Sequence, residues 1–261
     1  MILMNEPFED EALVIDRKPT GDADLIVTFL TAEHGKMIAR VKGVRKANAK
    51  NAPGLDLFCL STIELTPGHG YPVLMRATPI NPWNLSQNLD ASTRMRLVAE
   101  VSSAAAYVEE ADYELFAEVL EYRDSALKAG IAPESNLLQA LCRIADHSGY
   151  TPQLQDCAEC GQLICAIGSG VQSDKWVYFA PSHGAVVHIR CVEPGTVTRR
   201  CSREGIILLQ EAFAGLSALS LPSPHHAEAR DLLLGHLAYQ FGHSFPAAKM
   251  LRALENGTLM L

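Results

Sequence analysis

Four metal-ligating side chains, arranged in two pairs of equal spacing, constrain the middle of this chain most. Two residues separate Cys157 from Cys160, and two residues also separate His188 from Cys191. Zn²⁺ in structural sites takes a closed tetrahedral set of Cys and His ligands, commonly supplied as such pairs. Gly161 directly follows the first pair, and glycine suits the tight turn that aims two ligands at one point. The pattern predicts a zinc knuckle whose role is structural, since four protein ligands leave no position for water.

Two other interpretations of these cysteines stay open, a redox pair and simple packing in the core. A redox Cys-x-x-Cys is expected in a thioredoxin-like βαβ context, whereas a helical pattern precedes this one. Cys165, His183 and Cys201 lie close enough in sequence to be alternative ligands. A zinc deaminase needs His-x-Glu before its Pro-Cys-x-x-Cys, but here the His-x-Glu at residues 226–228 follows the cysteines. That enzyme class is therefore excluded.

The cysteine content and the apolar pattern indicate a reducing, cytoplasmic environment. Seven cysteines in 261 residues are an odd number, and they are too few for a disulfide scaffold. No apolar run reaches the roughly 18 residues that cross a bilayer. Residues 1–7 lack the basic region of a secretory signal. In such a compartment a Cys-x-x-Cys binds metal or serves in redox chemistry more often than it forms a disulfide.

The first part of the chain carries short β-branched runs separated by turn residues. Five strands are predicted, at residues 12–15, 24–31, 36–41, 57–65 and 73–77. In the third, Met37, Ala39 and Val41 alternate with residues that include Lys36 and Arg40, so one face is apolar and the other is basic. Five short strands are typical of an OB-like barrel.

From residue 86 onward the pattern becomes helical. Residues 91–129 have apolar positions three or four apart and end before Gly130, a plausible C-cap. Further helices are predicted at 133–147, 204–216, 224–241 and 246–256. The predicted fold class is α+β, a five-stranded OB-like barrel followed by a mostly helical domain with an inserted zinc knuckle. The expected domains are an OB-like barrel at 1–82, helical parts at 83–150 and 201–261, and the knuckle insertion at 151–200.

A basic segment interrupts an otherwise acidic chain. The formal net charge is −8, so the molecule as a whole should be repelled by nucleic acid, and binding would need a local patch. Between Glu33 and Asp56 there is no acidic residue but six cations, Lys36, Arg40, Lys42, Arg45, Lys46 and Lys50. Basic charge on a small barrel binds single strands together with aromatic platforms, for which Tyr71 and Phe58 are candidates. A solvated basic hairpin that protects a strand edge is the alternative.

No motif proposes a catalytic nucleophile and its base. The phosphate loop, the dinucleotide fingerprint and the nucleophile elbow are all missing from the sequence. The nine histidines are scattered along the chain. We therefore expect a binding protein rather than an enzyme.

Two groups of motifs resemble the bacterial RecO family. The first resembles the opening barrel of that family and comprises Gly21-Asp22-Ala23-Asp24-Leu25, Thr31-x-Glu33-x-Gly35-Lys36 and Lys42-Gly43-Val44-Arg45-Lys46. The second resembles the entry to and exit from its zinc knuckle and comprises Gly149-Tyr150-x-Pro152-x-Leu154-x-x-Cys157-x-x-Cys160-Gly161 and Phe179-Ala180-Pro181-x-x-Gly184-Ala185-x-x-His188-x-x-Cys191. Relatives often have cysteine at the position of His188, so the ligand set of this chain would differ from theirs in combining three cysteines with one histidine.

The resemblance implies a non-enzymatic mediator of DNA repair and homologous recombination. Such proteins bind single- and double-stranded DNA, anneal complementary strands, and engage the acidic tail of single-stranded DNA-binding protein. With RecR they assist the loading of RecA, in association with the nucleoid. The six cations would then be phosphate contacts, which suits binding that ignores sequence. The alternative is a cytosolic, zinc-stapled interaction scaffold without direct DNA binding.

Overall fold

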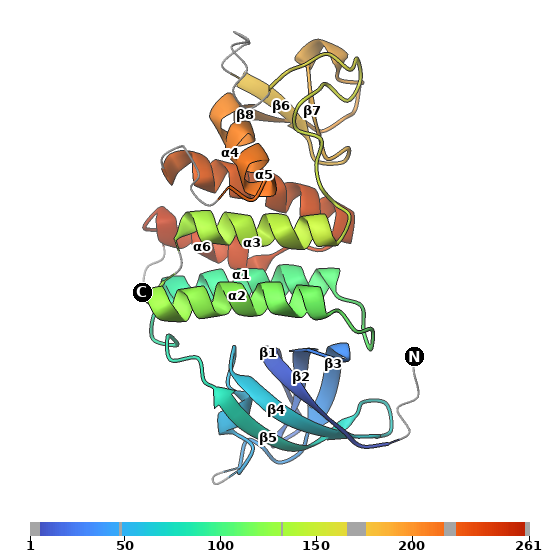
Figure 1. Cartoon of the computed structure of the whole chain (residues 1–261), viewed down its shortest axis with the longest axis vertical. Helices are drawn as coiled ribbons and strands as arrows, with labels where there is room; N and C mark the ends of the chain where they lie inside the picture. The colour runs from blue at the N-terminus through green and yellow to red at the C-terminus, as the bar shows by residue number, and fades with distance from the viewer. Residues whose placement is uncertain (1–5, 47–48, 132, 166–175, 217–222, 259–261) are drawn as a thin grey trace. The chain divides into compact units, whose positions relative to one another are not determined.

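A computed structural model describes residues 6–46, 49–131, 133–165, 176–216 and 223–258 (Figure 1). Residues 1–5, on which most of the expectation about a secretory signal rests, lie outside the described residues. The chain forms two compact units, Met1–Ile131 and Ala132–Leu261. Their boundary falls inside the segment 83–150, and the four-part domain division stays a prediction.

The first unit begins with the predicted five-stranded barrel. Its strands are β1 (Phe8–Thr20), β2 (Asp24–Thr31), β3 (Gly35–Val41), β4 (Leu60–Thr66) and β5 (Val73–Asn81). They close in the order β1-β2-β3-β5-β4, and β4 pairs back onto β1. All neighbours are antiparallel except β3 and β5, which meet in parallel at Arg40 and Val73. The OB-like barrel predicted from five short strands is confirmed.

The alternation along β3 orients its side chains as predicted. Met37, Ala39 and Val41 are buried in the barrel core, together with apolar side chains from the other four strands. The intervening residues Lys36 and Arg40 face outward. Side chains alternate between the two faces of a strand, so burial of one set presents the other on the surface.

Two capped helices complete the first unit. The side chain of Asn88 caps α1 (Leu89–Ala105), and that of Asp112 caps α2 (Tyr113–Ala129). The helix α2 ends at Gly130, which is left-handed with φ of 77°, as predicted. Between the helices the chain leaves the helical pattern. Val108, an apolar residue within the stretch 91–129 predicted to be helical, is 51% exposed in this loop.

Arg123 of α2 joins the helices of this unit to the barrel. Its guanidinium is fully buried and donates to the Phe58 carbonyl at 2.8 Å and to the Asn81 carbonyl at 2.5 Å. Burial lowers its pKa, while the neighbouring Asp124 carboxylate acts in the opposite direction. The same contact holds the backbone of Phe58, whose φ is 64°, and the Phe58 ring packs edge-on against Trp83.

The second unit combines helices with a small sheet. Its helices are α3 (Glu134–His147), α4 (Arg203–Phe213), α5 (Ser223–Phe241) and α6 (Pro246–Glu255), each within three residues of its predicted end. A sheet of order β7-β6-β8 comprises β6 (Trp176–Ala180), β7 (Ala185–Val187) and β8 (Arg199–Ser202). This sheet was not predicted, but the α+β class is confirmed.

A buried arginine joins three helices of the second unit. Arg230 of α5 is 1% exposed and pairs with Glu134 of α3 at 2.5 Å and with Glu255 of α6 at 2.7 Å. These contacts raise its pKa despite the opposing effect of burial. Among the described residues, no helix has both the length and the apolar character to cross a membrane.

Replacing Gly35 by alanine tests the contact between the barrel and the α1–α2 loop. A Cβ at Gly35 would lie 1.7 Å from the Glu110 carbonyl oxygen, and the residue has φ of 65°. We expect Gly35→Ala to lower the free energy of unfolding by about 3 kcal/mol, because overpacking adds to the left-handed strain. Gly21→Ala is the matched control, with φ of 55° and nothing within 4 Å, and should cost only about 1 kcal/mol. Equal losses in urea unfolding would contradict the proposed contact.

Candidate functional site

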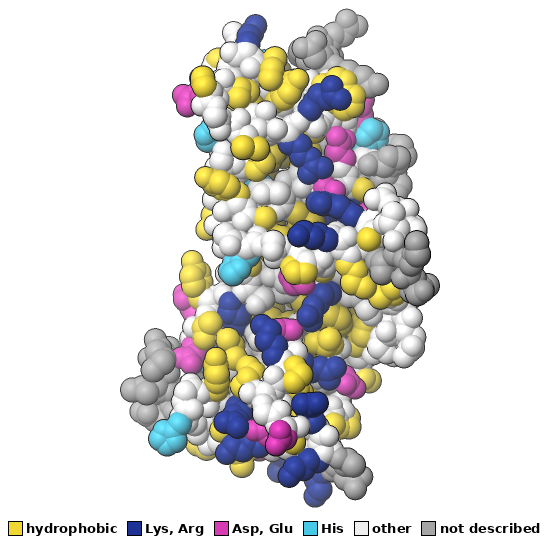
Figure 2. All heavy atoms as spheres, turned by 180° about the vertical axis from the view of Figure 1, so that it is seen from behind, with side chains coloured by type: hydrophobic (Ala, Val, Ile, Leu, Met, Phe, Trp, Pro, Cys, Tyr) yellow, Lys and Arg dark blue, Asp and Glu magenta, His cyan; other side chains and the backbone are white. Residues whose placement is uncertain are grey.

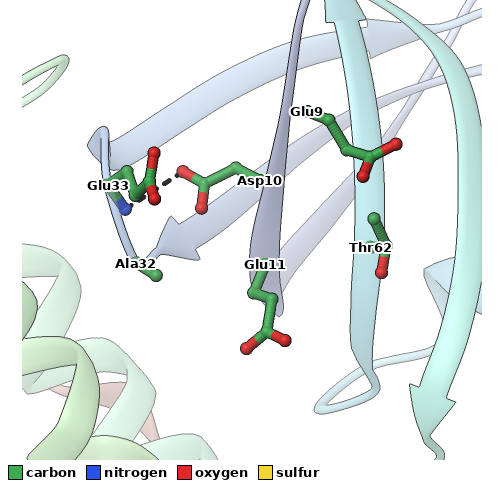
Figure 3. Close-up of a pocket in the computed structure, with 6 residues that line it drawn as sticks. All are labelled: Glu9, Asp10, Glu11, Ala32, Glu33 and Thr62. Atoms are coloured by element: carbon green, nitrogen blue, oxygen red, sulfur yellow. Dashed lines mark hydrogen bonds between the residues drawn. The ribbon is translucent and has the colours of Figure 1, made fainter.

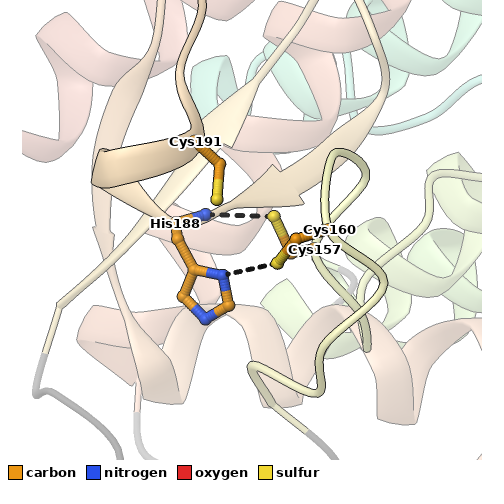
Figure 4. A group of neighbouring side chains, drawn as sticks. All are labelled: Cys157, Cys160, His188 and Cys191. Carbon is orange, nitrogen blue, oxygen red and sulfur yellow. Dashed lines mark hydrogen bonds between the residues drawn. The ribbon is translucent and has the colours of Figure 1, made fainter.

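The structure brings the four predicted ligands together in the second unit (Figure 4). One ligand atom each from Cys157, Cys160, His188 and Cys191 lies within 4.8 Å of all the others. Cys157 is buried, Cys160 is exposed, and the other two are partly buried. A tetrahedral zinc with sulfur ligands at about 2.3 Å has edges of about 3.8 Å between them. A small contraction of this cluster would reach that geometry.

Backbone pairing with β7 positions the first ligand pair. The amide of Ala158 donates to the Val186 carbonyl at 3.0 Å, so the Cys157 segment lies along β7. The chain then turns, with the Gly161 amide donating to the Cys157 carbonyl at 2.9 Å. Gly161 has φ of 68°, the left-handed conformation that was expected of it. Both thiols of the pair consequently lie on one side of the turn.

The second ligand pair lies directly after β7 in a single 3-10 turn. The amide of Cys191 donates to the His188 carbonyl at 2.9 Å, which places both side chains on one side. The backbone amide of His188 lies 3.4 Å from the Cys157 sulfur, and its Nδ1 lies 3.4 Å from the Cys160 sulfur. Nδ1 is therefore the histidine atom placed to bind a metal.

The electrostatics of the cluster favour a thiolate at its buried end. Burial raises the pKa of Cys157, but backbone N–H groups of His188, Cys160 and Glu159 outweigh it and lower the pKa to about 6. Burial raises the pKa of Cys191, and the neighbouring thiols Cys160 and Cys157 raise it further. A bound cation would relieve this repulsion between thiolates, because metal binding releases the protons of its ligands.

The alternative ligands lie elsewhere in the second unit. Cys201 is buried on β8, where its thiol contacts the Val177 carbonyl at 3.3 Å and burial raises its pKa to about 12. Cys165 is also buried, and its pKa is raised by burial. Neither these two nor His183 belongs to the cluster found among the described residues. The ligand set predicted from the paired spacing is the set that the fold assembles.

Two side chains from the helices hold the knuckle segment in place. Gln210 of α4 donates to the Leu154 carbonyl at 2.7 Å and the Cys165 carbonyl at 3.0 Å. His236 of α5 lies with its two ring nitrogens each 3.0 Å from a carbonyl oxygen, those of Pro181 and Tyr150. The cluster is therefore built on the helices as well as on the sheet.

Of the basic segment, Lys36 has a structural partner. It begins β3 and its ammonium donates to the Ser103 carbonyl at 2.5 Å, within the last turn of α1. Carbonyls in the last turn of a helix lack helical partners, so a lysine here caps α1. Burial lowers the pKa of Lys36. Six residues of strand place it about 20 Å from Lys42.

Asp24 anchors the start of the basic loop, which we define as residues 42–46 and 49–50. Its carboxylate accepts from the Gly43 amide at 2.8 Å and pairs with Arg40 at 2.7 Å. The Gly43 bond and then the Arg40 contact lower the pKa of Asp24. The Arg45 amide adds a bond to the Ala23 carbonyl at 3.0 Å. The loop is thereby fixed to the β1–β2 turn.

The other cations of the basic segment are presented to solvent. The exposed set comprises Lys42, Arg45, Lys46 and Lys50. Figure 2 shows Lys and Arg side chains gathered at the end of the barrel. Tyr71 is 48% exposed and adjoins Pro72, whose carbonyl accepts from the Arg40 amide at 2.8 Å. Phe58 is buried, so of the two aromatic candidates only Tyr71 is placed to meet a ligand.

The opposite end of β2 carries an acidic pocket (Figure 3). It has a volume of about 390 Å³ and is lined by Glu9, Asp10, Glu11, Ala32, Glu33 and Thr62. Asp10 is buried and accepts from the Glu33 amide at 3.1 Å and from His34 at 2.8 Å. Eight residues of strand separate this pocket from the basic loop, about 25 Å. Its carboxylates would repel a phosphate backbone.

An aromatic and basic face on the small sheet was not predicted from the sequence. Trp176 of β6 is 41% exposed, and the Arg200 guanidinium of β8 lies 4.5 Å from its ring centroid. The aromatic and β-branched run at residues 176–179 is typical of a strand and would have identified β6. The missed strand matters because it brings these two side chains together.

The comparisons with known proteins agree with this architecture. The family models described as Recombination protein O N terminal and Recombination protein O C terminal match residues 4–83 and 86–249. DNA repair protein RecO from Cutibacterium acnes is 31% identical over 196 residues, 72% of this chain and 76% of that protein. The protein of that name from Nocardioides sp. is 29% identical over 89% of this chain and 93% of that protein. The one from Myxococcus xanthus is 30% identical over 91% of this chain and 93% of that protein. The chain belongs to the RecO family of DNA repair proteins.

Proposed function

We propose that this protein is a DNA repair and recombination mediator that binds DNA through its barrel. It anneals complementary strands, engages single-stranded DNA-binding protein and RecR, and assists RecA loading without catalysing a reaction. The observation that carries the proposal is the exposed cluster of cations on the anchored basic loop in a family member of net charge −8. The partners follow from family membership.

The contact surface comprises the exposed cations of the basic loop. Lys42, Arg45 and Lys46 would meet phosphates, with Lys50 at the end of the loop. Arg40 would join them by leaving its ion pair with Asp24 and pairing with a phosphate instead. The exchange costs little, because ion pairs at exposed sites contribute little to stability and are screened by salt. Lys36 contributes to the fold of α1 rather than to this surface.

Tyr71 supplies a stacking platform beside these cations. Its ring is exposed, and the adjoining Pro72 is bonded to the backbone of Arg40. Single-strand binding combines such a ring with a positively charged groove, and stacking tolerates every base. Phosphates carry no sequence information either. Binding of this kind suits annealing of arbitrary strands.

The Cys/His cluster holds a structural zinc in this proposal. Three sulfur ligands and one imidazole are a preferred zinc set, and four protein ligands leave no open position for catalysis. Zinc here would join the turn at Cys157 to the end of β7. Its contribution is stability of the small sheet and its loops.

The runner-up function is an interaction scaffold that does not bind DNA. Lys36 contacts the Ser103 carbonyl and Arg40 pairs with Asp24, both within the protein. These contacts are compatible with a basic segment that only stabilises the fold. The two functions differ in whether DNA binding exists and depends on salt. The salt dependence of oligonucleotide binding therefore distinguishes the two functions.

Charge reversal in the basic loop tests the DNA surface. Binding to a single-stranded oligonucleotide should fall with salt at a log–log slope of about 3.5 when all five cations contact phosphate. We expect Lys42→Glu/Arg45→Glu to reduce affinity at least tenfold at low salt and to lower the slope by about 1.4. Fluorescence anisotropy over a salt series measures both quantities.

The matched control for that experiment is Lys128→Glu/Lys249→Glu. Both lysines are exposed on helices, and this variant changes the net charge by the same amount. It should retain most of the affinity and the full slope. Equal effects of the two variants would show that only net charge matters, and absence of binding would favour the scaffold.

Metal analysis tests the zinc proposal. Purified protein should contain about one zinc per chain, and Cys157→Ser should lose it because a buried thiolate ligand is removed. Cys142→Ala is the control, since this cysteine is buried on α3 outside the cluster. The control should retain zinc. A Cys157→Ser protein with full zinc content and unchanged melting temperature would refute the structural role.

A further inference from the structure

The small sheet of the second unit presents an aromatic and basic face that the proposed DNA surface does not use. We propose that Trp176, Tyr178 and Arg200 form a second contact surface for single-stranded nucleic acid. The proposal rests on the proposed function, because it adds a second strand contact to a DNA-binding protein. The ligand is an unpaired segment whose bases stack on the sheet.

The strand register places these three side chains on one face. Tyr178 lies opposite Arg200 in the antiparallel pair of β6 and β8, and directly opposed residues point to the same side. Val177 lies opposite Cys201, and both are buried on the other side. Trp176 is two residues from Tyr178 and therefore shares its face. The stack of Arg200 on Trp176 at 4.5 Å agrees with this register.

The chemistry of this face suits unpaired bases. Single-stranded binding proteins stack successive bases on aromatic rings, and arginine planes also accept a base. Trp176 and Tyr178 are two residues apart on the strand, so their rings are neighbours on one face and could stack successive bases. Arg200 is exposed and lies against one of them, where it adds a positive charge for a phosphate. Stacking and charge are combined at one place.

The sequence segment that carries Arg200 is rich in arginine in a protein that is acidic overall. Residues 186–203 contain the single acid Glu193 and four arginines, Arg190, Arg199, Arg200 and Arg203. Arg190 is exposed and hydrogen-bonds to a neutral oxygen, that of the Gln162 side chain. Arg199 lies opposite Phe179 and therefore projects from the other side of the sheet. On the face itself, the positive charge available to a phosphate is therefore that of Arg200.

Nucleic acid fits this face better than an acidic peptide does. An acidic peptide would use the arginine, but its carboxylates offer no aromatic ring to stack on two adjacent rings. A second surface would also serve annealing, because the protein must hold two strands at once. The barrel would contact one strand and the sheet the other.

Tryptophan fluorescence reports on this face directly. The chain has two tryptophans, and Trp83 is buried against Phe58, so Trp83→Phe leaves Trp176 as the single reporter. Circular dichroism and the melting temperature verify that this variant folds. Titration with oligothymidylate should quench the fluorescence of Trp176 to saturation, because a stacked base contacts the ring. Polyglutamate of equal charge should leave it unchanged.

The outcomes separate this inference from the proposed function. If anisotropy shows DNA binding that Lys42→Glu/Arg45→Glu weakens while Trp176 stays unquenched, the second surface is refuted and the proposed function stands. Quenching by polyglutamate alone would assign the face to an acidic peptide and refute the inference. If no DNA binds, both fail.

Substitution on the face provides a second test in the unaltered background. Trp176→Ala should weaken single-strand binding about five- to tenfold, whereas Trp176→Phe should restore most of it. Duplex binding should change little, because paired bases are already stacked and cannot reach the ring. Tyr239→Ala, which removes a 62% exposed aromatic ring from α5, is the control and should keep full affinity. Equal losses on single strands and duplex would refute stacking.

Discussion

The alternation along β3 is the constraint on which the barrel and its charged surface both depend. Its apolar side chains fill the core, so Lys36 and Arg40 must face outward. A shift of one residue would turn these cations inward, and burying an unpaired ion costs on the order of several kcal/mol. The same pleat therefore builds the core and presents the cations. Asp24 then fixes the following loop by binding the Gly43 amide and Arg40 together.

Separation of charge within the barrel explains how an acidic protein can present a surface for phosphate. The basic loop lies beside the β1–β2 turn, whereas Asp10 and Glu33 lie at the far end of β2. At physiological salt, exposed charges are screened over roughly 8 Å, and the two ends are about 25 Å apart. A phosphate at the basic loop would experience its cations far more than the acidic pocket. The net charge of −8 is thus compatible with local binding.

Much of the fold could be predicted because it follows from short-range patterns. Alternation identified the barrel strands, apolar spacing identified the helices, and paired spacing identified the four side chains, His188 included, that the fold brings together. The role of Lys36 could not be predicted, because its partner is the Ser103 carbonyl, 67 residues away in sequence. Phe58 was misplaced as a platform for a similar reason, since the buried Arg123 that holds it lies on a later helix. The sheet that brings Trp176 to Arg200 was not predicted, because β7 and β8 have only three and four residues, too few to show a clear alternation.

The central claim is that this family member acts on DNA strands as a mediator, and strand annealing measures it most directly. Complementary oligonucleotides coated with single-stranded DNA-binding protein would be mixed with the protein purified in the presence of zinc. Duplex formation would be followed by fluorescence energy transfer. The account predicts annealing well above the spontaneous rate, with strong inhibition by salt because phosphate contacts are screened. Annealing no faster than in the absence of the protein, under conditions where it is folded, would contradict the account.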